Sequence, residues 1–211
     1  MRALILGAAA LLVGCAATAP HYYSLQAPAI APVPQDRELA ADYVISVQPV
    51  LIPEQLARPQ IVVSASEGAE VVPLNTALWA GPLEAQIRDA LAQALAQRLN
   101  VVDIGLAKSE GTPLWRIYVD VQRFDSLYGQ EVRQDIVWRL VPQGMAEGVG
   151  KRVCSAQVRL PVDIGMSALV EGHRRSLDML AGVMAQTLPG QGAALAPESP
   201  VDGLHFRGCV G

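Results

Sequence analysis

The sequence predicts an α+β fold, in which a mostly antiparallel sheet carries two helices packed on one of its faces. Two long segments repeat apolar residues at helical spacing, one before and one after three segments in which apolar and polar residues alternate. Short turns join the three alternating segments, which favours an antiparallel meander. Two further strand-like runs come first, so the predicted order is strand, strand, helix, three strands, helix.

The two leading strands are short. Residues 43–50 are rich in valine and isoleucine, and this run passes into a loop at Pro49 and Pro53. The second strand is expected over residues 60–64. Residues 65–81 contain Gly68, Pro73 and Gly81 and are expected to form turns.

The first helix is expected to follow Gly81 as the N-cap, with Pro82 as its first helical residue and Asn100 at its end. Proline suits this position because the first amide of a helix has no intrahelical partner. The apolar stripe of this helix consists of Leu83, Ile87, Ala90, Leu91, Ala94 and Leu95.

The meander follows the helix. Its first strand alternates from Trp115 to Val121, but Phe124 then falls on the polar phase. A β-bulge near Gln122 and Arg123 explains the slip. The turn at residues 128–130 leads into the return strand. The second and third strands are expected over residues 132–140 and 154–160.

The second helix is expected over residues 167–188, stopped by Pro189 and Gly190. We therefore place the α+β domain at residues 43–190. Residues 191–211 lack periodicity, so we expect an irregular C-terminal tail.

The composition narrows the class of protein. The chain has 211 residues, of which 51% are hydrophobic, and its formal net charge is −4. A negative balance argues against nucleic acid as a partner, since nucleic-acid binding usually needs a basic face. It also argues against electrostatic adhesion to anionic lipid.

The N-terminus resembles the signal sequence of a lipoprotein. Arg2 is followed by an apolar run of 11 residues that is too short to span a membrane, for which about 20 residues are needed. The run ends in the lipobox-like stretch of residues 12–15, Leu-Val-Gly-Cys. We expect residues 1–14 to be a signal peptide and Cys15 to carry covalent lipid. The alternative is a short buried helix that ends in a core cysteine.

Residues 15–42 are expected to form a lipidated tether. Its prolines oppose long regular structure, although His21 to Leu25 suits a short edge strand. Ala16 follows the cysteine. In the lipoproteins that this N-terminus resembles, alanine there favours export to the outer membrane, whereas aspartate favours retention in the inner one.

Acylation of Cys15 would leave Cys154 and Cys209 as an even pair in an oxidising compartment. They are a candidate disulfide that would attach the tail to the domain. The alternative is a buried thiol and a separate thiol in the tail.

The sequence contains neither a recognised catalytic motif nor a metal-ligand spacing, so we expect no catalytic residue, no metal and no cofactor besides the lipid. His173 lies beside Arg174 and Arg175, which should disfavour its protonation. We expect these three residues on a solvated helix face; the alternative is an anion-binding site.

The segment between the first two strands contains Pro49-Val50, Ile52-Pro53, Leu56 and Arg58-Pro59-Gln60-Ile61-Val62. With these residues it resembles the auxiliary lipoproteins of ABC-type transport systems, a family that includes the paraquat-inducible protein C lipoproteins. The Tyr23-x-Leu25 pattern, Trp79 with Leu83, and the last helix are also similar. The resemblance spans about residues 21–188. Its most specific parts are the Arg-Pro-Gln-Ile-Val stretch of residues 58–62 and the lipobox.

The resemblance implies a non-enzymatic subunit of an envelope lipid transport system, anchored in the outer membrane and facing the periplasm. Its implied partners are an MCE-domain protein, an ABC transporter permease, or both; assembly into a homo-oligomer is a further hypothesis. The prolines make the strand connection rigid, so Pro53, Arg58, Pro59 and Gln60 are a candidate docking loop; the alternative is a connection without a partner. A second hypothesis is a stand-alone periplasmic lipid-binding or hydrolytic lipoprotein, which needs a deep apolar pocket between sheet and helices.

Overall fold

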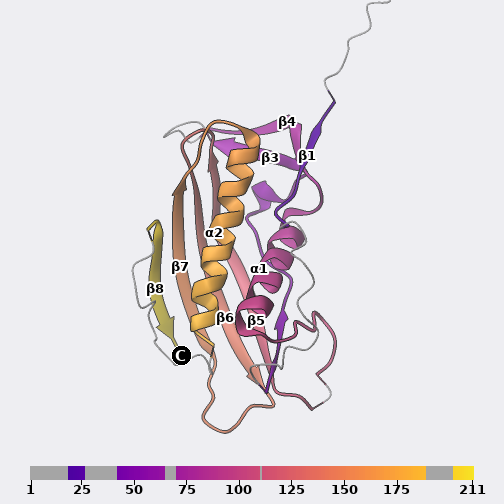
Figure 1. The fold of residues 1–211 in the computed structure, drawn as a ribbon, viewed down its shortest axis with the longest axis vertical. Helices are drawn as coiled ribbons and strands as arrows, with labels where there is room; N and C mark the ends of the chain where they lie inside the picture. Colours follow the sequence, from indigo (N-terminus) through magenta and orange to yellow (C-terminus); the bar gives the residue numbers. More distant parts are fainter. Residues whose placement is uncertain (1–18, 27–41, 65–69, 110, 189–201) are drawn as a thin grey trace, which may run out of the picture.

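The computed structural model describes residues 19–26, 42–64, 70–109, 111–188 and 202–211. Within them, two helices cover one face of an eight-stranded sheet (Figure 1). The helices are α1 (Leu83–Leu99) and α2 (Met166–Gln186), and a 3₁₀ turn, η2, spans Glu54–Leu56. The strands are β1 (His21–Tyr23), β2 (Val44–Val47), β3 (Gln60–Ser64), β4 (Val71–Trp79), β5 (Leu114–Leu127), β6 (Glu131–Gln143), β7 (Arg152–Pro161) and β8 (Leu204–Val210).

The sheet is mixed, so the prediction of a mostly antiparallel sheet is wrong. Its strands run in the order β1-β4-β3-β5-β6-β7-β8, and β2 pairs with β5. The meander β5-β6-β7 is antiparallel as predicted. However, β1 runs parallel to β4, and β2 and β3 run parallel to β5. These strands pair with partners distant in the sequence, so no tight turn fixes their direction.

Two strands occur where the sequence predicts irregular structure. β4 lies within residues 65–81, which were expected to form turns, and β8 lies in the expected irregular tail. In β4 most side chains are exposed up to Thr76, so no buried alternation marks its first two thirds. β8 is an edge strand on β7 with a similarly weak apolar pattern.

The predicted bulge in β5 is confirmed. The register of β5 against β6 shifts between Val121 and Arg123. The extra residue reverses which side chains face the helices, so Phe124 and Ser126 are buried while Arg123 is exposed. The bulge therefore places a hydroxyl group, at Ser126, beneath α2.

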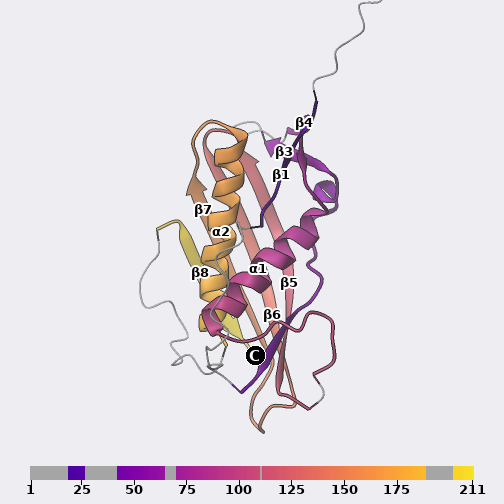
Figure 2. The same ribbon diagram turned by 45° about the vertical axis from the view of Figure 1, so that its right-hand side comes forward.

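Both helices place their leucine stripes in the core. α1 begins at Leu83, one residue later than predicted, because Pro82 is its N-cap. α2 lies very close to the sheet at Gly172, where an added Cβ atom would stand 2.3 Å from Cγ1 of Val162. The fully buried apolar residues of the helices include Leu83, Ile87, Leu91, Leu95, Leu99, Leu169, Leu177, Leu180 and Met184. Figure 2 shows the two helices crossing the same face of the sheet.

The expected short edge strand is confirmed at His21–Tyr23, and a hydrogen bond attaches the segment that follows it to α1. The side chain of Leu25 is buried just after this strand. Its amide donates to Oε1 of Gln86 at 2.9 Å, and Nε2 of Gln86 donates to the carbonyl of Gly81 at 2.8 Å. The buried amide side chain of Gln86 thus joins the N-terminal segment to the helix.

A charged cluster attaches α1 to β2. Nη2 of Arg88 lies 2.9 Å from Oδ2 of Asp103, and Nε of Arg88 donates to the carbonyl of Val47 at 3.1 Å. Oδ1 of Asp103 accepts from the amides of Val47 and Gly105, both at 3.2 Å. We call Arg88, Asp103 and these backbone partners the arginine cluster.

Candidate functional site

The candidate docking loop is an ordered connection between β2 and β3. Its 3₁₀ turn ends at Leu56, whose side chain is buried and holds the loop against the domain. The carbonyl of Pro59 accepts a hydrogen bond from the amide of Trp79 at 2.7 Å. Arg58 and Pro59 are exposed, so a rigid backbone presents a cation and a proline ring to solvent.

A hollow of about 400 Å³ lies between this loop and the start of α1. Pro59, Trp79 and Pro82 supply apolar surface, while Arg58 and Glu84 bring opposite charges to the same hollow. We call it the Arg58 hollow. Its lining combines apolar rings with two charges, which suits a peptide segment better than a simple ion. The complete lining is Ala57, Arg58, Pro59, Trp79, Gly81, Pro82, Leu83 and Glu84.

The four residues of the candidate docking loop do not share one surface. Pro53 lines a second hollow of about 250 Å³, together with Leu56, Val62 and Arg123. Gln60 is half-buried and pairs with Leu78 in the sheet. The structure thus brings Arg58 and Pro59 together and separates them from Pro53.

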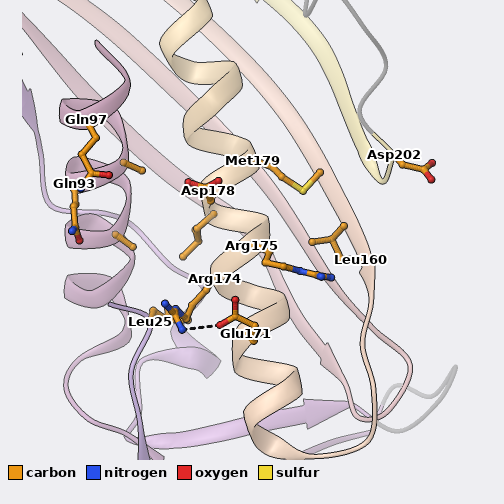
Figure 3. A pocket seen from close by; sticks show the side chains of 13 residues that line it. Leu25, Gln93, Gln97, Leu160, Glu171, Arg174, Arg175, Asp178, Met179 and Asp202 are labelled. Carbon is orange, nitrogen blue, oxygen red and sulfur yellow. Dashed lines mark hydrogen bonds and ion pairs between the residues drawn. The ribbon is translucent and has the colours of Figure 1, made fainter. Parts of the chain in front are cut away.

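A shallow groove of about 630 Å³ runs over the outer faces of α1 and α2. Figure 3 shows Gln93 and Gln97 on α1, opposite Arg174 and Asp178 on α2. Arg174 forms an ion pair with Glu171 at 2.7 Å. The groove lies outside the helices, whereas the second hypothesis requires an apolar pocket between helices and sheet. Its apolar lining consists of Leu25, Ala90, Ala94, Leu160, Leu177 and Met179.

His173 is fully buried, so the prediction of a solvated face is wrong for this residue. Its ring stacks on Phe124, with ring centroids 4.0 Å apart. Burial lowers the pKa of His173 to about 3, so desolvation rather than the neighbouring arginines keeps the ring neutral. Nε2 of His173 lies 2.8 Å from Oγ of Ser126, and Nδ1 lies 3.0 Å from Nε2 of Gln134. We call Ser126, Gln134 and His173 the histidine cluster.

The proton positions in this cluster oppose serine catalysis. Nε2 of Gln134 also donates to the carbonyl of His173 at 3.2 Å, and a carbonyl can only accept. That contact identifies the Gln134 atom as the amide nitrogen, so Nδ1 of His173 accepts and Nε2 carries the proton. The histidine then donates to Ser126, whereas a general base must accept the serine proton. This geometry fits a structural role.

The candidate disulfide is present in the structure, between Cys154 of β7 and Cys209 of β8. The two residues are direct partners in the antiparallel ladder. The bond joins two residues that are 55 positions apart in the sequence, and it attaches the last strand to the sheet. Cys15, the candidate lipidation site, lies outside the described residues.

Within the described residues, no group of three or more histidine, cysteine, aspartate or glutamate side chains is placed to hold a metal ion. No helix in that part of the chain has the length and apolar character needed to cross a bilayer.

Sequence reasoning missed three residues of the Arg58 hollow as site residues: Trp79, Pro82 and Glu84. From the sequence alone, Trp79 is only part of the family resemblance and Pro82 is only the predicted first residue of the helix. Recognition of β4 as a strand would have placed them beside Pro59, because the β3–β4 register pairs Gln60 with Leu78.

Comparisons with known proteins agree along most of the chain. Residues 23–185 match the family described as "ABC-type transport auxiliary lipoprotein component". The chain is 25% identical over 198 residues to the protein named "Intermembrane transport lipoprotein PqiC" of Escherichia coli strain K12, covering 92% of this chain and 95% of the relative. The protein of the same name from Shigella flexneri gives the same values.

Two solved structures share the fold. The crystal structure of an uncharacterized protein aligns with a TM-score of 0.59 and 21% identity, over 80% of this chain and 97% of that one. A protein from Xanthomonas campestris aligns with a TM-score of 0.56 and 17% identity, over 78% and 92% of the two chains.

Proposed function

The chain belongs to the ABC-type transport auxiliary lipoprotein family, and on this premise we propose that it is a non-enzymatic subunit of an intermembrane lipid transport system. In this proposal, acyl chains on Cys15 anchor it in the outer membrane, and the domain faces the periplasm. Its partner is an MCE-domain protein or an ABC transporter permease. The observation that carries the proposal is the match to an intermembrane transport lipoprotein over 92% of this chain.

Two features of the structure support an adaptor rather than an enzyme. The histidine cluster is buried and holds its proton on the nitrogen that faces Ser126, which is the wrong arrangement for a general base. The leucine stripes of both helices are packed in the core, so they do not line an internal lipid pocket. The stand-alone lipid-binding hypothesis is therefore less favoured than an adaptor role.

The Arg58 hollow is the proposed contact with the partner. Arg58 is exposed, and within the described residues its side chain has no hydrogen bond or ion pair. A charge without an internal partner, fixed beside proline and tryptophan rings, is available to a carboxylate on another protein.

Anchoring is tested by mass spectrometry and membrane fractionation. The mature protein should begin at an acylated Cys15 and fractionate with the outer membrane. Cys15→Ala should prevent acylation, and Ala16→Asp should move the acylated protein to the inner membrane. A mature protein with an unmodified Cys15 would contradict the proposed anchor.

Docking is tested by affinity purification of the acylated protein from cell envelopes. The wild type should recover an MCE-domain protein or a permease, and Arg58→Glu should reduce the recovery by about tenfold if one charge-assisted contact is lost. Arg207→Glu is the matched control, since Arg207 is an exposed arginine on β8, outside the hollow. Equal loss in both variants, or no loss in either, would contradict docking at this hollow.

A further inference from the structure

Exposed apolar side chains gather at one end of the molecule. They are Val71 and Val72 of β4, Tyr128 in the turn between β5 and β6, and Ile164 in the connection between β7 and α2. Tyr22 is exposed on β1, which lies at the same end of the molecule (Figure 1), although its partner in β4 is Leu78 rather than Val71. We call these five residues the apolar tip.

The strand registers and one backbone hydrogen bond place four of these residues together: Val71, Val72, Tyr128 and Ile164. Ser64 pairs with Val71 on one side and with Leu127, the last residue of β5, on the other. The amide of Val162 donates to the carbonyl of Gln130 at 2.9 Å, which places the connection that follows β7 beside the β5–β6 turn. Figures 1 and 2 both show β1, the β3–β4 pair and the start of α2 at this end.

The exposure at the tip is large. Ile164 is 82% exposed and Tyr22 is 65% exposed, although both side chains are mostly apolar. A group of exposed apolar residues marks a contact site more often than scattered ones do. A second such group, Val102, Leu106, Val153 and Val210, lies toward the opposite end of β5, so exposure alone does not identify what covers the tip.

The position of the lipid anchor distinguishes the two ends. Cys15 precedes the first residue of β1, His21, by six positions, and six residues span at most about 22 Å. The 14 residues of β5 extend over about 45 Å, so the opposite end of the molecule lies beyond that reach from the end that carries β1. An anchor at Cys15 would therefore keep the end with the apolar tip nearer the lipid.

The chemistry of the tip suits a zwitterionic lipid surface. Tyr22 and Tyr128 have apolar rings and polar hydroxyl groups, the combination that favours the membrane interface. Glu70 and Asp163 are exposed beside Val71 and Ile164, so the tip offers no attraction to anionic head groups.

We propose that the apolar tip rests on the membrane surface that holds the acyl chains of Cys15, and that this contact orients the domain with its opposite end toward the periplasm. The inference rests on the proposed anchoring at Cys15. The lipid surface covers apolar side chains that the fold leaves exposed, and the domain takes a defined orientation rather than moving freely on its tether.

The test uses the protein expressed from the full chain, with its signal sequence, purified and reconstituted with phosphatidylcholine vesicles. The chain has three cysteines; with Cys15 acylated and the other two bonded to each other, an introduced cysteine is the only free thiol. An environment-sensitive fluorophore is attached at Ile164→Cys or, as the matched control, at Leu106→Cys, which is 73% exposed toward the opposite end. Nitroxide groups on the lipid chains report contact by quenching.

We expect quenching and a shift of the emission to shorter wavelength at position 164, with neither effect at position 106. If the protein floats with the vesicles but both probes stay unquenched, or both are quenched alike, the inference is overturned while anchoring stands. If the protein is not acylated and does not float, the proposed anchor fails and the inference fails with it.

A second variant measures the contribution of one side chain. With the probe at Tyr128→Cys, adding Ile164→Glu should lower the ratio of contacting to detached molecules by about tenfold. The reason is that the favourable free energy of burying the isoleucine side chain is lost and a charge is introduced. Leu106→Glu should leave that ratio unchanged. An unchanged ratio with Ile164→Glu would also overturn the proposal.

Discussion

Beneath α2, Ser126, Gln134 and His173 form a neutral cluster in complete burial, whereas at the edge of α1 a charged pair keeps contact with water. The side chains of Arg88 and Asp103 retain 26% and 16% exposure. Both clusters attach a helix to strands, but only the edge position lets ionised groups keep part of their hydration. The difference shows that depth beneath a helix, rather than the need for a polar link, determines whether that link is charged.

Removal of His173 should have the largest effect. His173→Ala leaves a void beside Phe124 and removes the partner of both Ser126 and Gln134, so the free energy of unfolding should fall by about 3 to 4 kcal/mol. Urea denaturation measures the change. Arg175→Ala, on an exposed position of the same helix, should change stability by less than about 0.5 kcal/mol. A loss below about 1 kcal/mol for His173→Ala would refute the role given to the cluster.

Acidification should act on the histidine cluster next most strongly. The pKa of His173 is lowered from 6.5 to about 3 by burial, so below pH 6.5 the unfolded chain binds a proton that the folded protein does not. The free energy of unfolding should therefore fall by about 2 kcal/mol between pH 7 and pH 5 on account of this residue. The measurement compares the pH dependence of the wild type with that of His173→Gln. Identical pH dependence of stability in the two proteins would contradict this prediction.

Removal of the positive charge of Arg88 on α1 should lower the free energy of unfolding by a smaller amount. Arg88→Met leaves Asp103 with its two backbone donors, so the loss should be about 1 to 2 kcal/mol. Arg98→Met is the control on the same helix: its ion pair with Asp178 has side-chain exposures of 34% and 59%, and its loss should stay below about 0.5 kcal/mol. Equal losses in the two variants would remove the distinction between a partly buried pair and a surface pair.

A high salt concentration should have the smallest effect on stability. It should nevertheless distinguish the charged arginine cluster from the neutral histidine cluster. At about 1 M salt the Debye length is near 3 Å, so the stability difference between wild type and Arg88→Met should shrink by a few tenths of a kcal/mol. The difference between wild type and His173→Gln should not change, because that cluster is neutral and buried. Denaturation curves at low and high salt measure both differences. An equal decrease of both stability differences would argue that the contribution of Arg88 is not electrostatic.

Local patterns predicted much of this fold. The stripe of α1, the meander, the bulge near Arg123 and most of α2 follow from the spacing of apolar residues. The rigid loop that presents Arg58 follows from its prolines. These features are decided within a few residues along the chain, where periodicity and backbone restriction act.

The missed features depend on partners distant in the sequence. β4 contains Pro73 and exposed side chains, and it is a strand because β3 and β1 pair with its two edges. β8 is held in the sheet by pairing with β7 and by the disulfide between Cys154 and Cys209. His173 has a polar partner inside the core because the bulge turns Ser126 toward α2. The wall of the Arg58 hollow formed by Trp79 was missed for the same reason, since it needs the β3–β4 register.

The parallel pairing of β1 with β4 has a mechanical consequence. A pull on the chain ahead of His21 acts along the strand axis, so the hydrogen bonds between β1 and β4 bear the load together in shear. The buried side chain of Leu25 and the bond from its amide to Gln86 resist the same displacement. Force from a tether at the front of the chain would thus pass into α1 and the sheet without peeling strands apart one bond at a time.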